Sequence, residues 1–464
     1  MNVLIAGEEV VGVRIAEELM EAHQVVYLAA EEIERLDRLD VEAVYGSLTS
    51  PELLRQARVH EADLFVACTN NDEQNIVACI AAQRLGAKRT VCMLTRAGFL
   101  SVSGDDAELA DSLGIDAVVR PAEELADEII RIVTVPGALD VAEFAGGRVR
   151  LLRYGVEEGA PITQAPLSQL PLPRQVNLVM LRRGDEMIIP RGDTVLKPGD
   201  KVVAMGRAGH VRKLLWRFLR NRDSETEKRT ATVVGAGTVG FSVVKGLEEA
   251  GFRVKVIETS KERCEEVAPQ LKSLVLNGDG ADLDLLEQEG IGDSSVLVAV
   301  ANNDEKNLLV SLLAKQLGVR RTVTRADRLS NELMFEKVGI DVVRSAKGAF
   351  IRSVVRGVDE RHSRIRAELE HGDAEVIELH LPSDFPTVLM RDLHPPTFAR
   401  IGAILRRRQL IVPRGDDRLE PRDQLLIFCT RRDEEETREF FLEVVPRRAR
   451  RGDERSTSAQ GAGR

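Results

Sequence analysis

The sequence has no long apolar segment, and this absence excludes a chain that crosses a membrane by itself. Within its 464 residues no apolar run approaches the roughly 18 residues that a helix needs to span a bilayer. The chain begins with a strand-like run rather than a basic segment followed by an apolar one, so we expect no signal peptide. Any role at a membrane must therefore come through a partner.

An excess of basic charge and paired cysteines are also missing. The net charge is −10, which argues against nucleic acid as a main partner because phosphate binding needs a basic face. The five cysteines form no Cys-x-x-Cys pair and are typical of reduced thiols in a cytosolic protein. The seven histidines show no metal-ligand spacing, so we predict no metal site. A composition with 43% hydrophobic and 30% charged residues indicates a globular protein.

What the sequence does contain is an internal repeat. Segments of the first half recur in the second half in the same order: residues 67–75 match 300–307 (Asn-Asn-Asp-Glu-x-Asn), 85–91 match 317–323, 113–120 match 338–344, and 189–200 match 412–423 (Pro-Arg-Gly-Asp and a second turn). Agreement in that order indicates a duplication. We expect a hairpin turn at each Pro-Arg-Gly-Asp, with a binding role as the alternative.

Each repeat divides into two lobes. Residues 1–135 and 229–358 alternate Val/Ile-rich runs with helical patterns, and the runs at 64–67 and 296–299 lack polar alternation, as buried parallel strands do. This alternation predicts an α/β fold in which each leading lobe is a Rossmann-like, doubly wound parallel sheet. Residues 136–207 and 359–445 have short strands between Gly, Pro and Asp, which predicts small α+β lobes with antiparallel pairing.

Two segments lie outside the four lobes. Residues 208–228 begin with a basic amphipathic helix, which we interpret as a connector that buries its apolar stripe; a helix that docks on a partner or a membrane surface is the alternative. The tail, residues 446–464, is rich in Arg, Ser and Gly, and we expect it to be disordered.

The second repeat carries a complete phosphate-binding motif. A strand-like run leads into Gly235-Ala236-Gly237-Thr238-Val239-Gly240, which is G-x-G-x-x-G before an amphipathic helix. In this motif the first glycine makes the tight turn, the second lets a pyrophosphate approach the backbone, and the third lets helix and sheet pack closely. A second strand ends in Glu258, 18 residues beyond Gly240, where a carboxylate favours a ribose diol over a 2′-phosphate. The motif predicts a site for NAD or an adenosine nucleotide.

The first repeat lacks this motif's critical residues. Gly7-Glu8-Glu9-Val10-Val11-Gly12 has Glu9 where the second repeat has Gly237, and two unit charges about 4 Å apart near a surface repel by roughly 4 kcal/mol. Its second strand ends without an acid at Ala29, and Ser47 stands where the second repeat has Asp279. We therefore predict weak or no nucleotide binding in the first repeat.

The tandem lobes resemble the TrkA family, the regulatory subunits of Trk potassium uptake systems, which are built from regulator-of-K⁺-conductance (RCK) domains. The resemblance covers residues 1–443 and is carried by residues 235–240 with Glu258, by Asn277-Gly278-Asp279, by the Asn-Asn-Asp-Glu-x-Asn loops and by the Pro-Arg-Gly-Asp turns. It implies a cytosolic nucleotide-sensing subunit, peripheral at the inner face of the plasma membrane, that gates a membrane potassium uptake channel or transporter. It also implies a ring, which we expect to be a homotetramer, and NAD(H) or ATP/ADP as the bound nucleotide.

The resemblance assigns roles to individual residues. The three glycines contact phosphates, Glu258 contacts the ribose, Asp279 the adenine edge and Arg325 a phosphate. For the loop at Asn302 and Asn303, both helix capping and ligand contact stay open. The predicted nucleotide-binding residues are Gly235, Ala236, Gly237, Thr238, Val239, Gly240, Glu258, Asp279, Asn302, Asn303 and Arg325.

The main rival interpretation is an NAD-dependent oxidoreductase with a duplicated dinucleotide-binding domain. Hydride transfer needs a substrate lobe whose acid/base group faces the nicotinamide. The small lobes contain no catalytic constellation of His, Lys or Tyr that we recognise, and one nucleotide site is degenerate. We therefore expect a regulatory protein rather than an enzyme.

Overall fold

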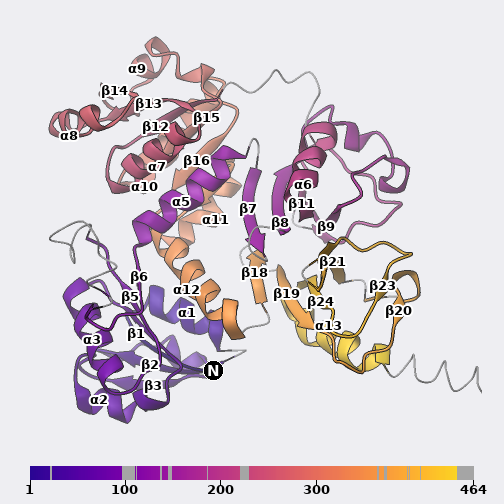
Figure 1. Ribbon diagram of the computed structural model, residues 1–464. Helices are drawn as coiled ribbons and strands as arrows, with labels where there is room; N and C mark the ends of the chain where they lie inside the picture. The colour runs from indigo at the N-terminus through magenta and orange to yellow at the C-terminus, as the bar shows by residue number, and fades with distance from the viewer. Residues whose placement is uncertain are drawn as a thin grey trace, which may run out of the picture. The chain divides into compact units, whose positions relative to one another are not determined.

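The computed structural model describes residues 1–20, 23–96, 110, 112–135, 138–144, 149–184, 186–219, 229–362, 365–369, 374–393, 395–396, 398–407 and 409–446. The tail predicted to be disordered therefore lies outside the described residues, apart from Pro446, as does the linker at 220–228. The chain forms two compact units (Figure 1). Unit 1 consists of Met1–Thr134 and Lys228–His362, and unit 2 consists of Val135–Glu227 and Ser363–Arg464. Like lobes are thus grouped across the repeats. Among the described residues, no helix combines the length and apolarity needed to span a membrane.

The first lobe of unit 1 is a parallel sheet with helices on both faces, as predicted. Its strand order is β3-β2-β1-β4-β5-β6, with the crossover between β1 and β4 that a doubly wound sheet requires. The strands are β1 (Asn2–Gly7), β2 (Gln24–Ala29), β3 (Glu42–Tyr45), β4 (Leu64–Cys68), β5 (Thr90–Met93) and β6 (Ala117–Val119), and the helices α1 (Val11–Leu19), α2 (Pro51–Gln56), α3 (Asp72–Arg84) and α5 (Pro121–Thr134).

The second lobe of unit 1 repeats this architecture. Its order is β14-β13-β12-β15-β16-β17, again parallel throughout the described residues. The strands are β12 (Thr230–Val234), β13 (Arg253–Glu258), β14 (Leu274–Asn277), β15 (Val296–Ala299), β16 (Thr322–Arg325) and β17 (Val342–Arg344), and the helices α7 (Thr238–Glu249), α8 (Lys261–Val267), α9 (Leu283–Gln288), α10 (Asp304–Gln316), α11 (Leu329–Lys337) and α12 (Ala346–His362).

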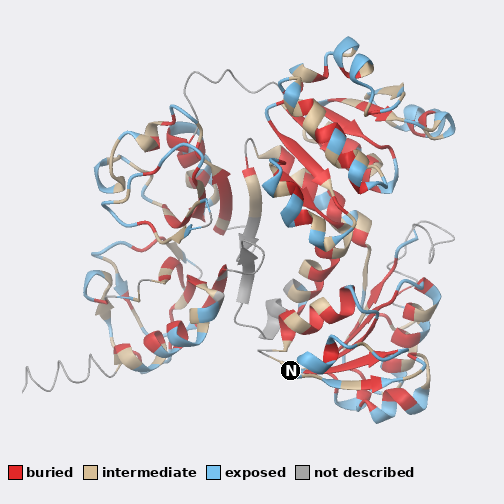
Figure 2. Cartoon of the chain, turned by 180° about the vertical axis from the view of Figure 1, so that it is seen from behind, coloured by how far each residue is buried: buried red, intermediate tan, exposed pale blue. Residues whose placement is uncertain are grey.

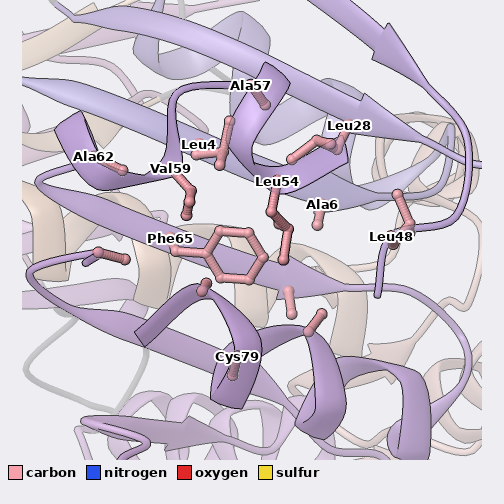
Figure 3. Close-up of a cluster of buried hydrophobic side chains, with 14 of the residues drawn as sticks. Leu4, Ala6, Leu28, Leu48, Leu54, Ala57, Val59, Ala62, Phe65 and Cys79 are labelled. Carbon is pink, nitrogen blue, oxygen red and sulfur yellow. The ribbon is translucent and has the colours of Figure 1, made fainter. Parts of the chain in front are cut away.

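The central strands are buried on both faces, which explains why their sequences do not alternate. Every residue of β4 and of β15 is buried, and the sheets stand out as buried ribbons in Figure 2. On one face of the first sheet Phe65 projects toward Leu54 of α2 and Cys79 of α3, all fully buried (Figure 3). Burial of one such side chain stabilises the fold by about 1.5–3 kcal/mol.

The other face of the first sheet is covered by a helix of the other lobe. Phe350, Ile351 and Val354 of α12 pack with α1 and the underside of β1 and β2. Reciprocally, α5 of the first lobe packs on α7 of the second, where a Cβ on Gly246 would overlap Ile130. The last helix of each lobe therefore completes the core of its partner lobe, and the two lobes form one body.

Unit 2 contains the two small lobes, each with the predicted antiparallel sheet. Their sheets have the orders β10-β9-β11-β8-β7 and β18-β19-β24-β21-β22 and pack together through residues such as Met180, Met205 and Phe428. The elements are β7 (Ala138–Phe144), β8 (Val149–Gly155), β9 (Val176–Arg183), β10 (Glu186–Ile188), β11 (Lys201–Arg207), α6 (Ala208–Leu214), β18 (Ile365–Leu369), β19 (Ala374–His380), β20 (Val388–Leu389), β21 (Ala399–Arg406), β22 (Gln409–Ile411), β23 (Arg418–Leu419), β24 (Gln424–Thr430) and α13 (Glu434–Glu439).

The predicted connector helix is part of the first small lobe. It consists of α6 and a π-helical turn, Leu215–Leu219, and its apolar stripe (Val211, Leu214, Leu215, Phe218 and Leu219) is buried in that lobe's core. The second small lobe ends in the same way, with α13 followed by the π-helical turn Phe440–Val444.

The Pro-Arg-Gly-Asp turns exist, but the hairpin prediction is wrong. In the first copy the amide of Thr194 donates to the carbonyl of Arg191 at 3.2 Å and closes the turn. The strands on either side do not pair with each other: β10 pairs with β9, and β22 pairs with β21 whereas β23 pairs with β20. The turns instead redirect the chain out of the main sheet.

A repeated Arg–Asp clamp explains why the second turn of each small lobe recurs in the sequence. Arg183 binds Asp200 with two hydrogen bonds of 2.8 and 2.7 Å, and Arg406 binds Asp423 in the same way. Both aspartates are almost fully buried and also accept a backbone amide from their own turn. The clamp joins the turn to the neighbouring strand through charge-assisted bonds.

The two clamped turns differ at one backbone position, which leads to a prediction. Gly199 has φ +85° in the first copy, and Arg422 holds the equivalent position with φ +64° in the second. Because a left-handed conformation costs a non-glycine residue about 1–2 kcal/mol, we expect Arg422→Gly to raise the free energy of unfolding by about 0.5–1 kcal/mol. Chemical denaturation measures this, and Gly199→Arg should shift stability in the opposite direction; a loss of stability in Arg422→Gly would contradict the argument.

Candidate functional site

The glycine turn of the second lobe has the geometry that phosphate binding requires. Gly235 follows β12 and has φ +101°, and a Cβ there would stand 2.9 Å from the amide nitrogen of Ala301. A Cβ on Gly240 would overlap the carbonyl of Gly235, so this glycine lets α7 approach the turn. A Cβ on Gly237, in contrast, would meet nothing within 4 Å. The open space is thus at the middle glycine, in front of a helix N-terminus.

The residues of the glycine turn, 236–240, differ in their exposure to solvent. Gly237 is the N-cap of α7 and has no side chain to occupy the first amides of the helix. Gly237 and Thr238 are exposed, whereas Ala236, Val239 and Gly240 are buried in the turn and the core. Among the predicted binding residues of this motif, Gly237 and Thr238 therefore face solvent, whereas Ala236, Val239 and Gly240 shape the turn.

Glu258 lies beside this turn at the end of β13. Its carboxylate accepts hydrogen bonds from the amide of Ala236 at 2.7 Å and from the amide of Ser260 at 2.9 Å. Partial burial by itself raises the pKa of Glu258, but the amides of Ser260 and Ala236 outweigh it and hold the pKa below the ordinary value. Glu258 is therefore ionised at neutral pH, and its predicted contact with a ribose stays a prediction.

Asp279 and Arg325 lie at the carboxyl ends of strands of the same sheet. Asp279 follows β14, accepts the amide of Ala281 and pairs with Lys306 at 2.9 Å. The hydrogen bond from Ala281 and the one from Lys306 lower the pKa of Asp279. Arg325, the last residue of β16, donates to Asp327 at 2.8 Å and to Asn302 at 2.7 Å. These groups lie at the sheet edge near the switch point between β12 and β15, which is the position of the ligand crevice in doubly wound folds.

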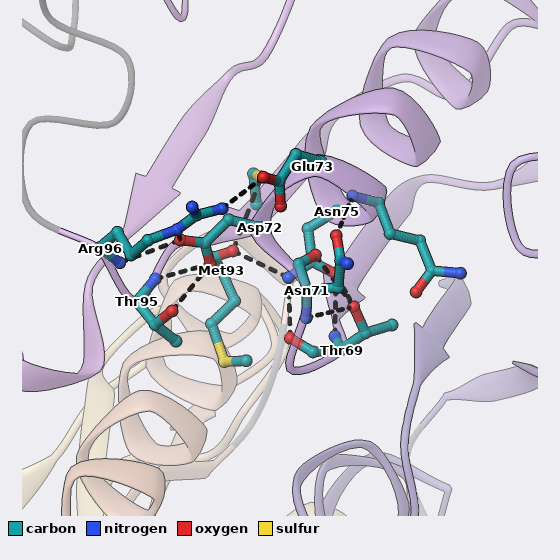
Figure 4. A network of polar contacts seen from close by, with 10 residues as sticks. Thr69, Asn71, Asp72, Glu73, Asn75, Met93, Thr95 and Arg96 are labelled. Atoms are coloured by element: carbon teal, nitrogen blue, oxygen red, sulfur yellow. Dashed lines mark hydrogen bonds and ion pairs between the residues drawn. The ribbon is translucent and has the colours of Figure 1, made fainter.

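The Asn-Asn-Asp-Glu-x-Asn loops have a structural role in both lobes. Asn71 and Asn303 cap α3 and α10 by accepting the amides of Gln74 and Lys306. The buried Asn75 bonds the backbone of Thr69 and of Met93, and so ties the ends of β4 and β5 together (Figure 4). Asn307 does the same in the second lobe with Ala301 and Arg325. Capping thus holds for Asn303, and the sequence analysis missed the strand-joining asparagines.

In the first lobe a side chain of the turn itself bonds to the neighbouring loop. Glu8 accepts from the backbone amide of Asn70 at 3.1 Å and also from the side-chain amide of Asn70. The obstruction by Glu9 stays a prediction, and the structure shows a further carboxylate, Glu8, that spans from the turn to the loop after β4. Tyr27 adds a hydrogen bond of 2.9 Å to the carbonyl of Glu8.

The backbone of the first turn differs as well. Gly7 is the last residue of β1, and α1 begins only at Val11, one position later than α7 begins in the second lobe. The strand registers of the two sheets show which positions are equivalent. Ala29 of the first lobe is equivalent to Glu258 of the second, and Met93 is equivalent to Arg325. Gln74 stands where the second lobe has Lys306. The charged groups of the second crevice therefore have no counterparts in the first.

Sequence reasoning missed Lys306, Glu8 and the replacement at Met93. The signal was present in the aligned repeats, because residues 90–93 read Thr-Val-Cys-Met where residues 322–325 read Thr-Val-Thr-Arg. Lys306 and Gln74 occupy the variable position of the shared loop. Only the contacts of these side chains identify them as part of either crevice.

Comparison with known proteins accounts for nearly the whole chain. The TrkA-N domain matches residues 3–121 and 231–346, and the TrkA-C domain matches residues 151–218 and 383–442. A Trk system potassium uptake protein TrkA homolog from Archaeoglobus fulgidus is 33% identical over 446 residues, which cover 95% of this chain and 100% of that protein. The chain belongs to the TrkA family.

Other relatives and solved structures agree with this assignment. The Trk system potassium uptake protein TrkA of Halomonas elongata is 30% identical, and the aligned region covers 92% of this chain and 95% of that protein. The crystal structure of the GsuK RCK domain has a TM-score of 0.56 at 20% identity, with 95% of this chain and 94% of that chain covered. The GsuK channel bound to NAD has a TM-score of 0.56 at 19% identity, covering 95% and 78%. This likeness confirms the RCK fold of the TrkA-family chain.

Proposed function

We propose that this TrkA-family chain is a regulatory subunit that senses an adenine nucleotide, NAD(H) or ATP/ADP, in its second lobe and gates a membrane potassium-translocating partner. The observation that carries the proposal is the contrast between the two crevices. The turn at Gly237 is open beside the ionised Glu258, while in the first lobe Glu8 of the equivalent turn bonds to the neighbouring loop. One chain then binds one nucleotide. That the similarly folded GsuK channel binds NAD supports this choice of ligand.

The packing of unit 1 supports a route from the crevice to the rest of the chain. The helix that begins at the phosphate turn, α7, packs on α5 through Gly246 and Ile130. Helix α5 ends at Thr134, and unit 2 starts at the next residue. A nucleotide that prefers one position of α7 shifts the equilibrium of α5 by the difference in its affinity for the two states.

A thermal-shift panel with ATP, ADP, NAD, NADH and NADP tests the ligand. At a concentration of about 100 times Kd, a ligand that binds only the native state adds about 2.7 kcal/mol to the free energy of unfolding. We expect this for at least one adenine nucleotide, a smaller effect for NADP, and loss of the effect in Glu258→Ala. No shift with any nucleotide would refute the proposal, and NADH formation from NAD with 2-hydroxy acids would favour the oxidoreductase instead.

We further propose that the chain assembles into a ring, with a homotetramer as the expected state. Large apolar side chains, Leu309 of α10 with Leu333, Met334 and Val338 at α11, are each about half exposed. Exposed apolar groups gathered on neighbouring helices are typical of a protein–protein contact.

Met334→Glu is expected to weaken this assembly at least tenfold, because a buried contact would have to desolvate the new charge. Light scattering measures the mass, with and without nucleotide. Val195→Glu, at an exposed apolar position of unit 2, serves as the control outside these helices. A wild-type chain that stays monomeric under both conditions would refute the ring.

A further inference from the structure

The two small lobes end in equivalent helices whose buried faces agree. In the first small lobe Leu214, Leu215 and Leu219 face the core, and in the second small lobe Phe440, Phe441 and Val445 take the matching positions. Thr437 and Val211, one turn earlier, are both buried as well. This agreement aligns residues 208–219 with residues 434–445 one to one, as two versions of one structural element (Figure 1).

The outer faces of these helices carry opposite charge. In the first small lobe the exposed positions of this helix hold Arg212, Lys213 and Arg217, which we call the basic face. In the second small lobe the exposed positions of the helix hold Glu435, Glu436 and Glu439, which we call the acidic face. Lys213 aligns directly with Glu439, and Arg217 aligns with Glu443. The duplication has therefore kept the core of this helix and reversed the charge at these two positions, whereas Arg212 aligns with the buried Arg438.

Within the described residues, none of the three basic or the three acidic side chains forms an ion pair, although ion pairs occur on the same helix, as between Glu434 and Arg438. Trp216 lies within the basic face and is 44% exposed. A surface of single-sign charge is common, but two faces of opposite charge on equivalent helices of one chain fit a specific partner, which is a second copy of the chain.

We propose that the basic face of one chain docks on the acidic face of the next, and that this contact fixes the direction of assembly. A face shared by two repeats could pair first lobe with first lobe, second with second, or first with second. Like charges disfavour the first two pairings, and opposite charges favour the third. The resulting contact is head-to-tail, the type that closes into rings. The inference deepens the proposed ring and rests on it, but it uses helices other than α10 and α11.

Individual exposed ion pairs are weak and are screened by salt. The contact therefore selects the orientation of neighbouring chains more than it supplies affinity. It predicts an assembly that weakens as ionic strength rises, and that responds to charge reversal on either face.

Sedimentation velocity on the full chain tests this with matched reversals. Lys213→Glu with Arg217→Glu makes both faces acidic, and Glu436→Lys with Glu439→Lys makes both faces basic. We expect each pair to raise the dissociation constant of assembly at least tenfold at low salt, and the four changes together in one chain to restore it to within threefold, because complementarity returns with its direction swapped. Arg253→Glu with Lys261→Glu, two exposed positions of unit 1, should leave the assembly unchanged.

Several outcomes would overturn this proposal. Paired reversals that assemble like the wild type, or a fourfold variant that does not recover, exclude the contact while leaving the proposed ring intact. A wild type that is monomeric at every salt concentration refutes both. If the basic-face variant keeps its mass but loses binding to phosphatidylglycerol vesicles, the basic face is a membrane site and the proposal fails. The nucleotide thermal shift of each variant reports separately on the second-lobe site.

Discussion

Replacing Gly237 by glutamate is expected to remove nucleotide binding from the whole chain. The middle glycine borders open space at the N-terminus of α7, and a side chain there would occupy the position available to a phosphate. A carboxylate about 4 Å from a phosphate charge near a surface repels it by roughly 4 kcal/mol, which corresponds to a loss in affinity of about 1,000-fold. Isothermal titration calorimetry measures both the affinity and the stoichiometry, which we expect to be one nucleotide per wild-type chain.

The reverse change in the first lobe is the matched control. Glu9→Gly should create no second site, because Glu8 still bridges to Asn70 and the first lobe has Ala29 and Met93 in place of the acid and the arginine. A Gly237→Glu chain that retains one full-affinity site would place the nucleotide in the first lobe. A Glu9→Gly chain that binds two nucleotides would show that one residue alone silences the first crevice.

Glu128→Ala is expected to destabilise unit 1 by about 3 kcal/mol. Glu128, on α5, receives two hydrogen bonds from Arg352 of α12, at 2.9 and 2.6 Å, and lies 3.8 Å from Arg344. Glu128 and Arg344 are 7% and 6% exposed, so removal of the carboxylate leaves Arg344 as a buried charge without this counterion. Because α5 and α12 come from different lobes, the change weakens the packing between the lobes.

Denaturant titration followed by circular dichroism measures this loss. Glu123→Ala is the control on the same helix, because the Glu123 side chain is 57% exposed and its pair with Arg120 is long at 3.7 Å; we expect a change below about 0.5 kcal/mol. Equal effects of the two substitutions would show that the cluster around Glu128 is not what joins α5 to α12.

Local patterns predicted the elements of the fold and the sheet edge at which the residues of the candidate site lie. The apolar runs at β4 and β15 lack alternation because both faces of a doubly wound sheet are covered, so their burial follows from sequence alone. The turn at Gly235 requires a left-handed backbone, and Glu258 ends the next strand, which places both at one sheet edge. Such features depend on spacing along the chain over a few residues, and the repeat itself showed that they occur twice.

Which surfaces meet was decided only by the tertiary structure. The apolar stripe of α12 indicates that one side of the helix is buried. The stripe does not specify which sheet face the helix packs on, and in the structure α12 packs on the sheet of the other lobe. Glu8 bonds to Asn70 across 62 residues, and this contact depends on the direction of the side chain after the strand ends. Contacts of this kind depend on distances in space between distant residues, which hydrophobic periodicity and motif spacing do not encode.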